Sequence, residues 1–193
     1  MQKTGKLELT WVGKYDEVAV EPRILIEDPS KSYGDPNSEN MLIHGDNLIA
    51  LQALQQDYAG KIKCIYIDPP YNTGSAFEHY DDNLEHSIWL NLMYSRLNML
   101  RDLLTEDGVI YIQIDDNEQA NLKLLCDKTF GEKHFVCNFI WEKTVNPNTT
   151  FTNVGIVHEY ILCYSKGIRQ LNKVAYSEDD IKSYTCRDKY IET

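Results

Sequence analysis

The chain alternates between short apolar runs and longer stretches in which apolar residues recur every three or four positions. The short runs are rich in β-branched residues and bounded by turn formers, which predicts buried strands. The longer spacing predicts amphipathic helices. The predicted strands are 41–44, 63–67, 109–114, 135–141 and 157–164, and the predicted helices are 47–59, 86–104 and 117–130. We expect Asp46 to cap the first helix and Asp115 or Asp116 to cap the last.

Strands that alternate with helices are joined by right-handed crossovers, and they form a mostly parallel sheet with helices on both faces. The pattern therefore predicts an α/β fold. Ligands of such sheets bind beyond the carboxyl ends of the strands. Because Asp46, Asp68 and Asp115 each come just after a predicted strand, we expect these three carboxylates along one edge of the sheet.

The regular pattern occupies only part of the chain. We expect an amino-terminal arm and loop over 1–40, with a short strand near Leu7–Val12 and a cluster of turn formers before its end. One folded domain is expected over 41–167. Beyond it the periodicity fades and charges become frequent, so 168–193 is interpreted as a linker.

The composition of the chain argues against several classes of protein. Of the 193 residues, 42% are hydrophobic and 25% are charged, no apolar run could span a bilayer, and no secretory signal is visible, so we expect a cytoplasmic location. Five cysteines without Cys-x-x-Cys spacing argue against a zinc site or a disulfide framework, and Cys64, Cys137 and Cys163, in strand-like runs, are expected to be buried. The net charge of −11 argues against nonspecific DNA binding by this chain alone.

The residues Asp68-Pro69-Pro70-Tyr71 form the motif with the clearest chemistry. The prolines fix φ and lack N–H donors, which leaves a stiff turn with outward-pointing carbonyls. A carboxylate and a carbonyl can accept the two N–H groups of an amine on a heteroaromatic ring and expose its lone pair, while the tyrosine ring stacks on the base. A base inside a duplex must be flipped out to reach such a pocket. The alternative is a purely structural turn in which Asp68 caps a helix.

With this motif, the chain resembles the modification subunits of type III restriction-modification systems. These are DNA amino-methyltransferases whose target-base motif precedes the cofactor motif. The resemblance covers about two thirds of the chain, in the family's order. The matching segments are His44–Leu48, Ile65–Gly74, Trp89-Leu90, Arg96-Leu97, Gly108–Ile110, Ile114–Asp116, Phe130–Glu132 and His158–Leu162.

The resemblance implies an incomplete Rossmann-like methyltransferase fold, with 41–167 as the front half of the catalytic domain. It implies S-adenosylmethionine as methyl donor and the N6 amine of adenine in double-stranded DNA as acceptor. It also implies a second modification subunit and a restriction helicase-endonuclease as partners. Residues 168–193 would then lead toward a target-recognition region.

The resemblance also implies roles for individual residues. Asp68 and the Pro69 carbonyl would accept from the adenine amine, Pro70 would complete the rigid turn, and Tyr71 would stack on the flipped base. Asp46, together with Asp68, would lie near the cofactor. An aspartate at the first motif position favours adenine over cytosine. The residues that would shape the substrate loop are Asn72, Thr73 and Gly74, the last of which permits positive φ.

Two further segments have open interpretations. His158 and Glu159 could contribute to the base pocket, although a structural role is favoured for the histidine. The helix that contains Trp89 is interpreted as part of the core.

The chain departs from the family because none of its ten glycines forms Gly-x-Gly, whereas the family carries a Phe-x-Gly-x-Gly cofactor segment downstream. Only 27 residues follow Lys166, so we expect the chain to lack the recognition region, to be a truncated enzyme and to be inactive alone.

Alternatives are a cytosine amine or a protein glutamine amide as acceptor, and an inactive chain that acts as an interaction module. An unrelated nucleotide-binding domain is disfavoured because no Walker-type glycine loop occurs.

Overall fold

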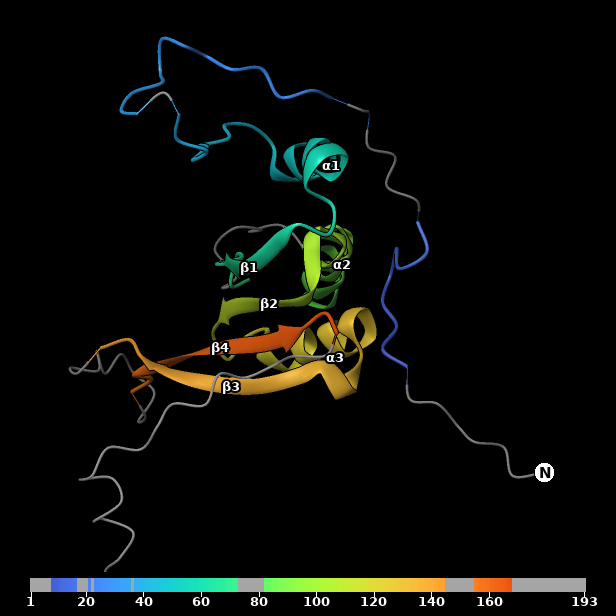
Figure 1. Ribbon diagram of the computed structural model, residues 1–193. Coiled ribbons are helices and arrows are strands. Elements are labelled where there is room, and N and C mark those ends of the chain that lie inside the picture. The colour runs from blue at the N-terminus through green and yellow to red at the C-terminus, as the bar shows by residue number, and fades with distance from the viewer. Residues whose placement is uncertain are drawn as a thin grey trace, which may run out of the picture.

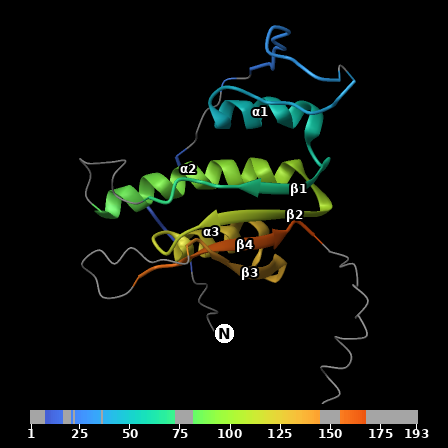
Figure 2. The ribbon, with the colours of Figure 1, turned by 90° about the vertical axis from the view of Figure 1, so that its left-hand side faces the viewer.

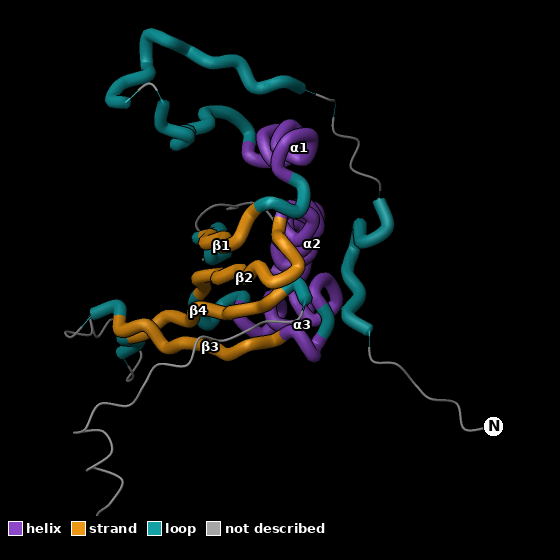
Figure 3. Tube along the Cα trace, in the orientation of Figure 1, coloured by secondary structure: helices purple, strands orange, loops and turns teal. Residues whose placement is uncertain are grey.

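The computed structural model describes residues 8–16, 21, 23–35, 37–72, 82–144 and 155–167. Figure 1 shows the helices and strands in space, and Figure 3 distinguishes them by colour. The elements in chain order are α1 (Asn47–Tyr58), β1 (Ile62–Ile67), α2 (Asp82–Leu103), β2 (Leu104–Ile114), α3 (Gln119–Phe130), the short 3-10 helix η1 (Glu132–His134), β3 (Phe135–Glu142) and β4 (His158–Ser165). No helix in this described part is long and apolar enough to cross a membrane.

The four strands form one sheet in the order β1-β2-β4-β3 (Figure 1). β1 and β2 pair in parallel, and β4 pairs antiparallel with both β2 and β3. Three strands therefore share one direction, and β4 runs against them. The predicted α/β fold is confirmed, but the described sheet is mixed rather than mostly parallel. The reason is that no described helix separates β3 from β4, so the chain turns back without the crossover that parallel strands require.

The core lies between the sheet and two helices. α2 and α3 cover the same face, as Figures 1 and 2 both show. Alternate side chains of β2 enter this core, where Ile110, Ile112 and Ile114 are fully buried against residues such as Leu97 and Leu125. The expectation of helices on both faces is not met within the described residues, because α1 packs against α2 at the β1 side of the sheet instead.

The opposite face of the sheet is open in the described part of the chain. Large side chains are exposed on it, with Tyr66 at 55%, Phe139 at 49% and Trp141 at 56% of their full accessibility. Cys64 is also exposed here, which corrects its predicted burial, because it points away from the helices. Cys163 is buried as predicted, and Cys137 is only half-buried.

The amino-terminal part of the described chain contains no strand. The predicted strands at 41–44 and near Leu7–Val12 are wrong for the described residues, which have extended or turn conformations. Met41 and Leu42 are 56% and 98% exposed. An apolar run becomes a strand only if a neighbouring strand accepts its backbone hydrogen bonds, and none lies beside 41–44 in the described sheet.

The predicted helix caps have different outcomes. Asp46 caps α1, since its Oδ1 accepts from the backbone N–H groups of Leu48 and Ile49 at 2.9 and 3.2 Å. At α3 the prediction is wrong, because the residue before the helix is Glu118. Asp115 instead accepts from the backbone and side chain of Asn117 in a local turn.

Candidate target-base site

The tetrapeptide Asp68–Tyr71 directly follows β1, as the sequence predicts, at the carboxyl end of the parallel pair. The Asp68 side chain is exposed to solvent, whereas Tyr71 is half-buried and packs against the core. The carboxylate is therefore accessible to a ligand, and the tyrosine ring beside it has a fixed support.

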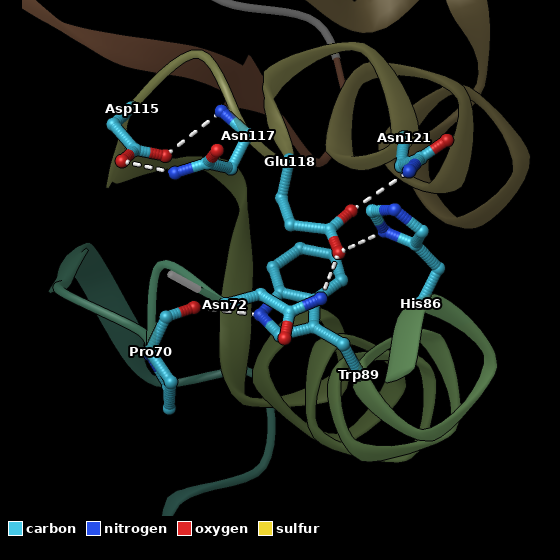
Figure 4. A network of polar contacts seen from close by, with 8 residues as sticks. All are labelled: Pro70, Asn72, His86, Trp89, Asp115, Asn117, Glu118 and Asn121. Carbon is cyan, nitrogen blue, oxygen red and sulfur yellow. Dashed lines mark hydrogen bonds and ion pairs between the residues drawn. The ribbon is translucent and has the colours of Figure 1, made fainter. Parts of the chain in front are cut away.

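The two proline carbonyls have different surroundings. The indole Nε1 of Trp89, a side chain only 2% exposed, donates to the Pro70 carbonyl at 2.6 Å (Figure 4). No hydrogen bond to the Pro69 carbonyl is found within the described residues. The turn is thus anchored through Pro70 and leaves the Pro69 carbonyl as an acceptor next to Asp68. Trp89 belongs to the core as expected, and it also holds this turn.

The Tyr71 hydroxyl is fixed by Glu159 on β4. It donates to Oε2 of Glu159 at 3.1 Å. Burial raises the pKa of Tyr71, and the neighbouring carboxylates of Glu159 and Asp68 raise it further. The phenol therefore remains protonated and acts as a donor. Its ring orientation is set from a strand that lies 88 residues further along the chain.

Glu159 is itself held by three donors. Gln113 Nε2 donates to its Oε2 at 2.5 Å, and Lys143 Nζ lies 2.7 Å from its Oε1, in addition to the Tyr71 contact. Burial raises the pKa of Glu159, but hydrogen bonds from Lys143, Gln113 and Tyr71 outweigh it, and the net pKa is lowered. The carboxylate is therefore ionised at neutral pH.

Asn72 follows the tetrapeptide and has a left-handed backbone, with φ of 56°. Its side-chain amide donates to Oε1 of Glu118 at 2.5 Å. The same oxygen lies 2.6 Å from Nδ1 of His86, and Oε2 accepts from Asn121 at 2.8 Å. Figure 4 shows these three side chains converging on Glu118. The structure thus brings Asn72 to the site through Glu118, which is not among the predicted site residues.

The other predicted site residues lie apart from this arrangement. Thr73 and Gly74 are outside the described residues. Asp46 is exposed and uses Oδ1 as a helix cap, and it follows no strand. Its place near a cofactor therefore stays a prediction. His158 contacts the Tyr160 hydroxyl at 3.0 Å, in keeping with a structural role.

One signal could have identified Glu118. It lies four residues before Leu122 and seven before Leu125, and both leucines are fully buried. Helical periodicity, extended back to the residue before α3, therefore places position 118 on the inner side of the helix. A carboxylate at an inner position requires partners.

Comparison with known proteins agrees with this geometry. A DNA modification methylase candidate from Thermus thermophilus, solved in complex with S-adenosyl-L-methionine, superimposes with a TM-score of 0.51 at 17% identity, over 70% of this chain and 63% of that one. The fold is thus that of the DNA methyltransferases. Residues 62–192 match the N6/N4 family described as DNA methylase, and the chain belongs to this family.

The resemblance to modification subunits is confirmed. The chain is 37% identical over 199 residues to the type III restriction-modification enzyme EcoP15I Mod subunit of Escherichia coli, covering 84% of this chain and 31% of that protein. It is 42% identical over 158 residues to the StyLTI Mod subunit of Salmonella typhimurium, covering 67% of this chain and 24% of that protein. The chain therefore spans less than a third of the length of either relative.

Proposed function

We propose that this chain carries the target-base site of an S-adenosylmethionine-dependent DNA adenine-N6 methyltransferase, the modification subunit of a restriction-modification system. The observation that supports this most is the exposed Asp68 carboxylate, which follows β1. Beside it lie a tyrosine ring fixed by Glu159 and the Pro69 carbonyl, which accepts no hydrogen bond from the described residues. An aromatic amine has two N–H groups, and these two acceptors match them in number.

The residues would act on a flipped adenine in three ways. Asp68 and the Pro69 carbonyl would each accept one N–H of the N6 amine, which draws the nitrogen lone pair out of conjugation with the ring. Tyr71 would stack on the base and hold it in place. Asp68 is also placed to take up the proton that the amine loses. Because all three groups belong to one short rigid turn, orientation supplies much of the expected rate.

This chain offers fewer groups for binding the cofactor than for binding the base. A backbone loop of Gly-x-Gly type normally approaches such a ligand closely, and the sequence contains none. Asp46 offers one carboxylate oxygen that is not used in capping α1. We therefore assign the base side of the reaction to this chain and place most contacts to S-adenosylmethionine outside it.

The proposed substrate and partners follow from the same assignment. The substrate is double-stranded DNA. Because the net charge is −11, the basic residues that contact its phosphates must be gathered locally or supplied by another part of the enzyme. The proposed protein partners are a second modification subunit and a restriction helicase-endonuclease. Names of the relatives support this proposal, since they describe Mod subunits of restriction-modification enzymes.

The test is a chimera in which this chain replaces the segment of the StyLTI Mod subunit that it matches. After incubation with S-adenosylmethionine and DNA, mass analysis of the nucleosides should show N6-methyladenine. Asp68→Ala should lower its formation by at least about 100-fold, because it removes one of the two acceptors that act on the amine. Asp127→Ala, a carboxylate on α3 bound to Lys123 and Tyr164, is the matched control and should leave the rate unchanged.

Two results of this test would overturn the proposal. One is a chimera that is folded and binds S-adenosylmethionine in calorimetry, yet forms no methylated adenine. The other is methylation at N4 of cytosine, which is the second candidate activity. The Asp68 position favours adenine, and the nucleoside analysis separates the two products directly.

A separate measurement addresses the cofactor. We predict that the 193-residue chain alone binds S-adenosylmethionine weakly or not at all and does not methylate DNA, since no Gly-x-Gly loop is available. Isothermal titration of the chain should give no saturable heat. Binding with a micromolar dissociation constant would contradict this prediction.

A further inference from the structure

Glu118 is a fully buried carboxylate, 0% exposed, that does not cap the helix it precedes. A residue in this position normally directs its side chain to the first N–H groups of the helix. Glu118 instead accepts from Asn72, His86 and Asn121. Burying a carboxylate is strongly unfavourable unless its oxygens are well satisfied. Its partners therefore indicate that Glu118 has a role other than beginning α3.

Two partners of Glu118 flank the segment 73–81 in the sequence, one before it and one after it. Asn72 ends the described part before this segment, and His86 lies in the first turns of α2, which follows it. A single oxygen, Oε1, lies within hydrogen-bond distance of both side chains. Asn121 fixes the second oxygen from α3, so the carboxylate has one defined orientation (Figure 4).

The restraint by Glu118 has a counterpart on the other side of Tyr71. Trp89, one turn after His86 on α2, binds the Pro70 carbonyl, and Glu118 binds the Asn72 amide. The tyrosine backbone is thus held at the residue before it and at the residue after it. The left-handed conformation of Asn72 is uncommon for a residue with a side chain, although asparagine adopts it more readily than most, and the Glu118 contact holds its side chain.

We propose that Glu118 is a positioning residue for the target base. Its buried carboxylate holds Asn72, and through Asn72 it sets the orientation of Tyr71 and of the Asp68–Pro70 turn. The inference rests on the proposed function, because positioning matters only if the turn binds a base. Glu118 itself touches neither base nor cofactor in this assignment.

The first test needs no activity. In a ¹H–¹⁵N spectrum of the full chain, three tryptophans give three indole signals, and Trp89→Phe identifies that of Trp89. Glu118→Ala should shift the Trp89 indole signal and speed its exchange with water, because a looser Asn72 loosens the adjoining turn. Asp127→Ala removes a multiply bonded carboxylate that lies within α3 and should leave this signal in place.

The second test uses the chimera described above. Glu118→Ala should lower kcat by about 100-fold, a loss typical of a misplaced reacting group, and leave KM for S-adenosylmethionine within about twofold. Glu118→Gln should restore kcat to within about fivefold, because its amide oxygen still accepts from Asn72 and its NH₂ group can donate to a turned Asn121. Asn72→Ala should lower kcat as Glu118→Ala does, and the double variant should lose no more than either single variant.

The outcomes separate the two proposals. An unsubstituted chimera that forms no N6-methyladenine refutes the proposed function, while the Trp89 indole signal still tests the positioning. An active chimera whose kcat is unaffected by Glu118→Ala, or equally reduced by Asp127→Ala, overturns the positioning role alone. If Glu118→Ala does not fold, Asn72→Ala and Glu118→Gln decide the question, and equal kcat values for these two variants and the parent overturn it.

Discussion

Two buried glutamates hold the same short segment by different means. Glu118 is 0% exposed and is bound by two neutral amides and a histidine. Glu159 is 5% exposed and is bound by Lys143, Gln113 and Tyr71. Lys143 is half-exposed and supplies a full positive charge, whereas His86 is charged only when protonated. A buried carboxylate can therefore be stabilised by several hydrogen-bond donors without a permanent charge, as well as by an opposite charge.

The largest expected difference concerns the free energy of unfolding. Glu118→Ala should lower it by about 3 kcal/mol, because the amides of Asn72 and Asn121 lose a buried acceptor. Glu159→Ala should lower it by about 1.5 kcal/mol, because Lys143 can return to water once its partner is gone. Urea unfolding of the two variants measures both losses. Equal losses would show that the two sites do not differ as described.

A second prediction uses the pH dependence of Glu159. Its pKa is lowered in the folded protein, so its contribution to stability is present above the unfolded pKa of about 4.5 and is lost as the pH falls through the folded pKa. Glu159→Gln should cost about 1 kcal/mol at pH 7, and the difference from the parent chain should shrink below about pH 4.5. Urea unfolding at a series of pH values tests this. A difference that stays constant into acid would contradict the assignment.

The smallest effect is expected at Lys143. Its side chain is 54% exposed, so Lys143→Met should lower the unfolding free energy by no more than about 0.5 kcal/mol. Tyr71 and Gln113 still donate to Glu159 in this variant. Thermal unfolding provides the measurement, with Lys63→Met as the control, because Lys63 pairs with Asp107 at an exposed site away from Tyr71. A loss well above that of the control would mean that the charge of Lys143 contributes more to stability than the hydrogen bonds from Tyr71 and Gln113 to Glu159 do.

The parts of the fold that depend on local pattern were predictable. The β1 strand, the α2 helix and the Asp46 cap follow from periodicity and turn chemistry, and the structure has each of them. The position of Asp68 at a strand end followed from the same pattern. The direction of β4 does not follow from this pattern, because alternating strands and helices predict crossovers throughout. The polar stretch after β3, which predicts no helix, favours a reversal of direction instead.

The parts of the site that depend on distant contacts were not predictable from pattern. The partners of Tyr71 and Asn72 lie 88 and 46 positions away, and no periodicity connects them. Trp89 fits a core position equally well with or without its bond to Pro70. Glu118 is preceded by two aspartates that resemble helix caps more closely, because short side chains suit that role. The contacts that Glu118 makes with Asn72, His86 and Asn121 exist only in the folded chain.

The central position of β4 has a consequence for biosynthesis. β4 is the last described strand to leave the ribosome, yet it lies between β2 and β3, so β3 has no described neighbour in the sheet until β4 is made. A nascent chain that stops before residue 158 would leave both sides of that gap unpaired and prone to aggregate. It would also lack Glu159, so the ring of Tyr71, which is synthesised earlier, acquires this anchor only after residue 159 has been made.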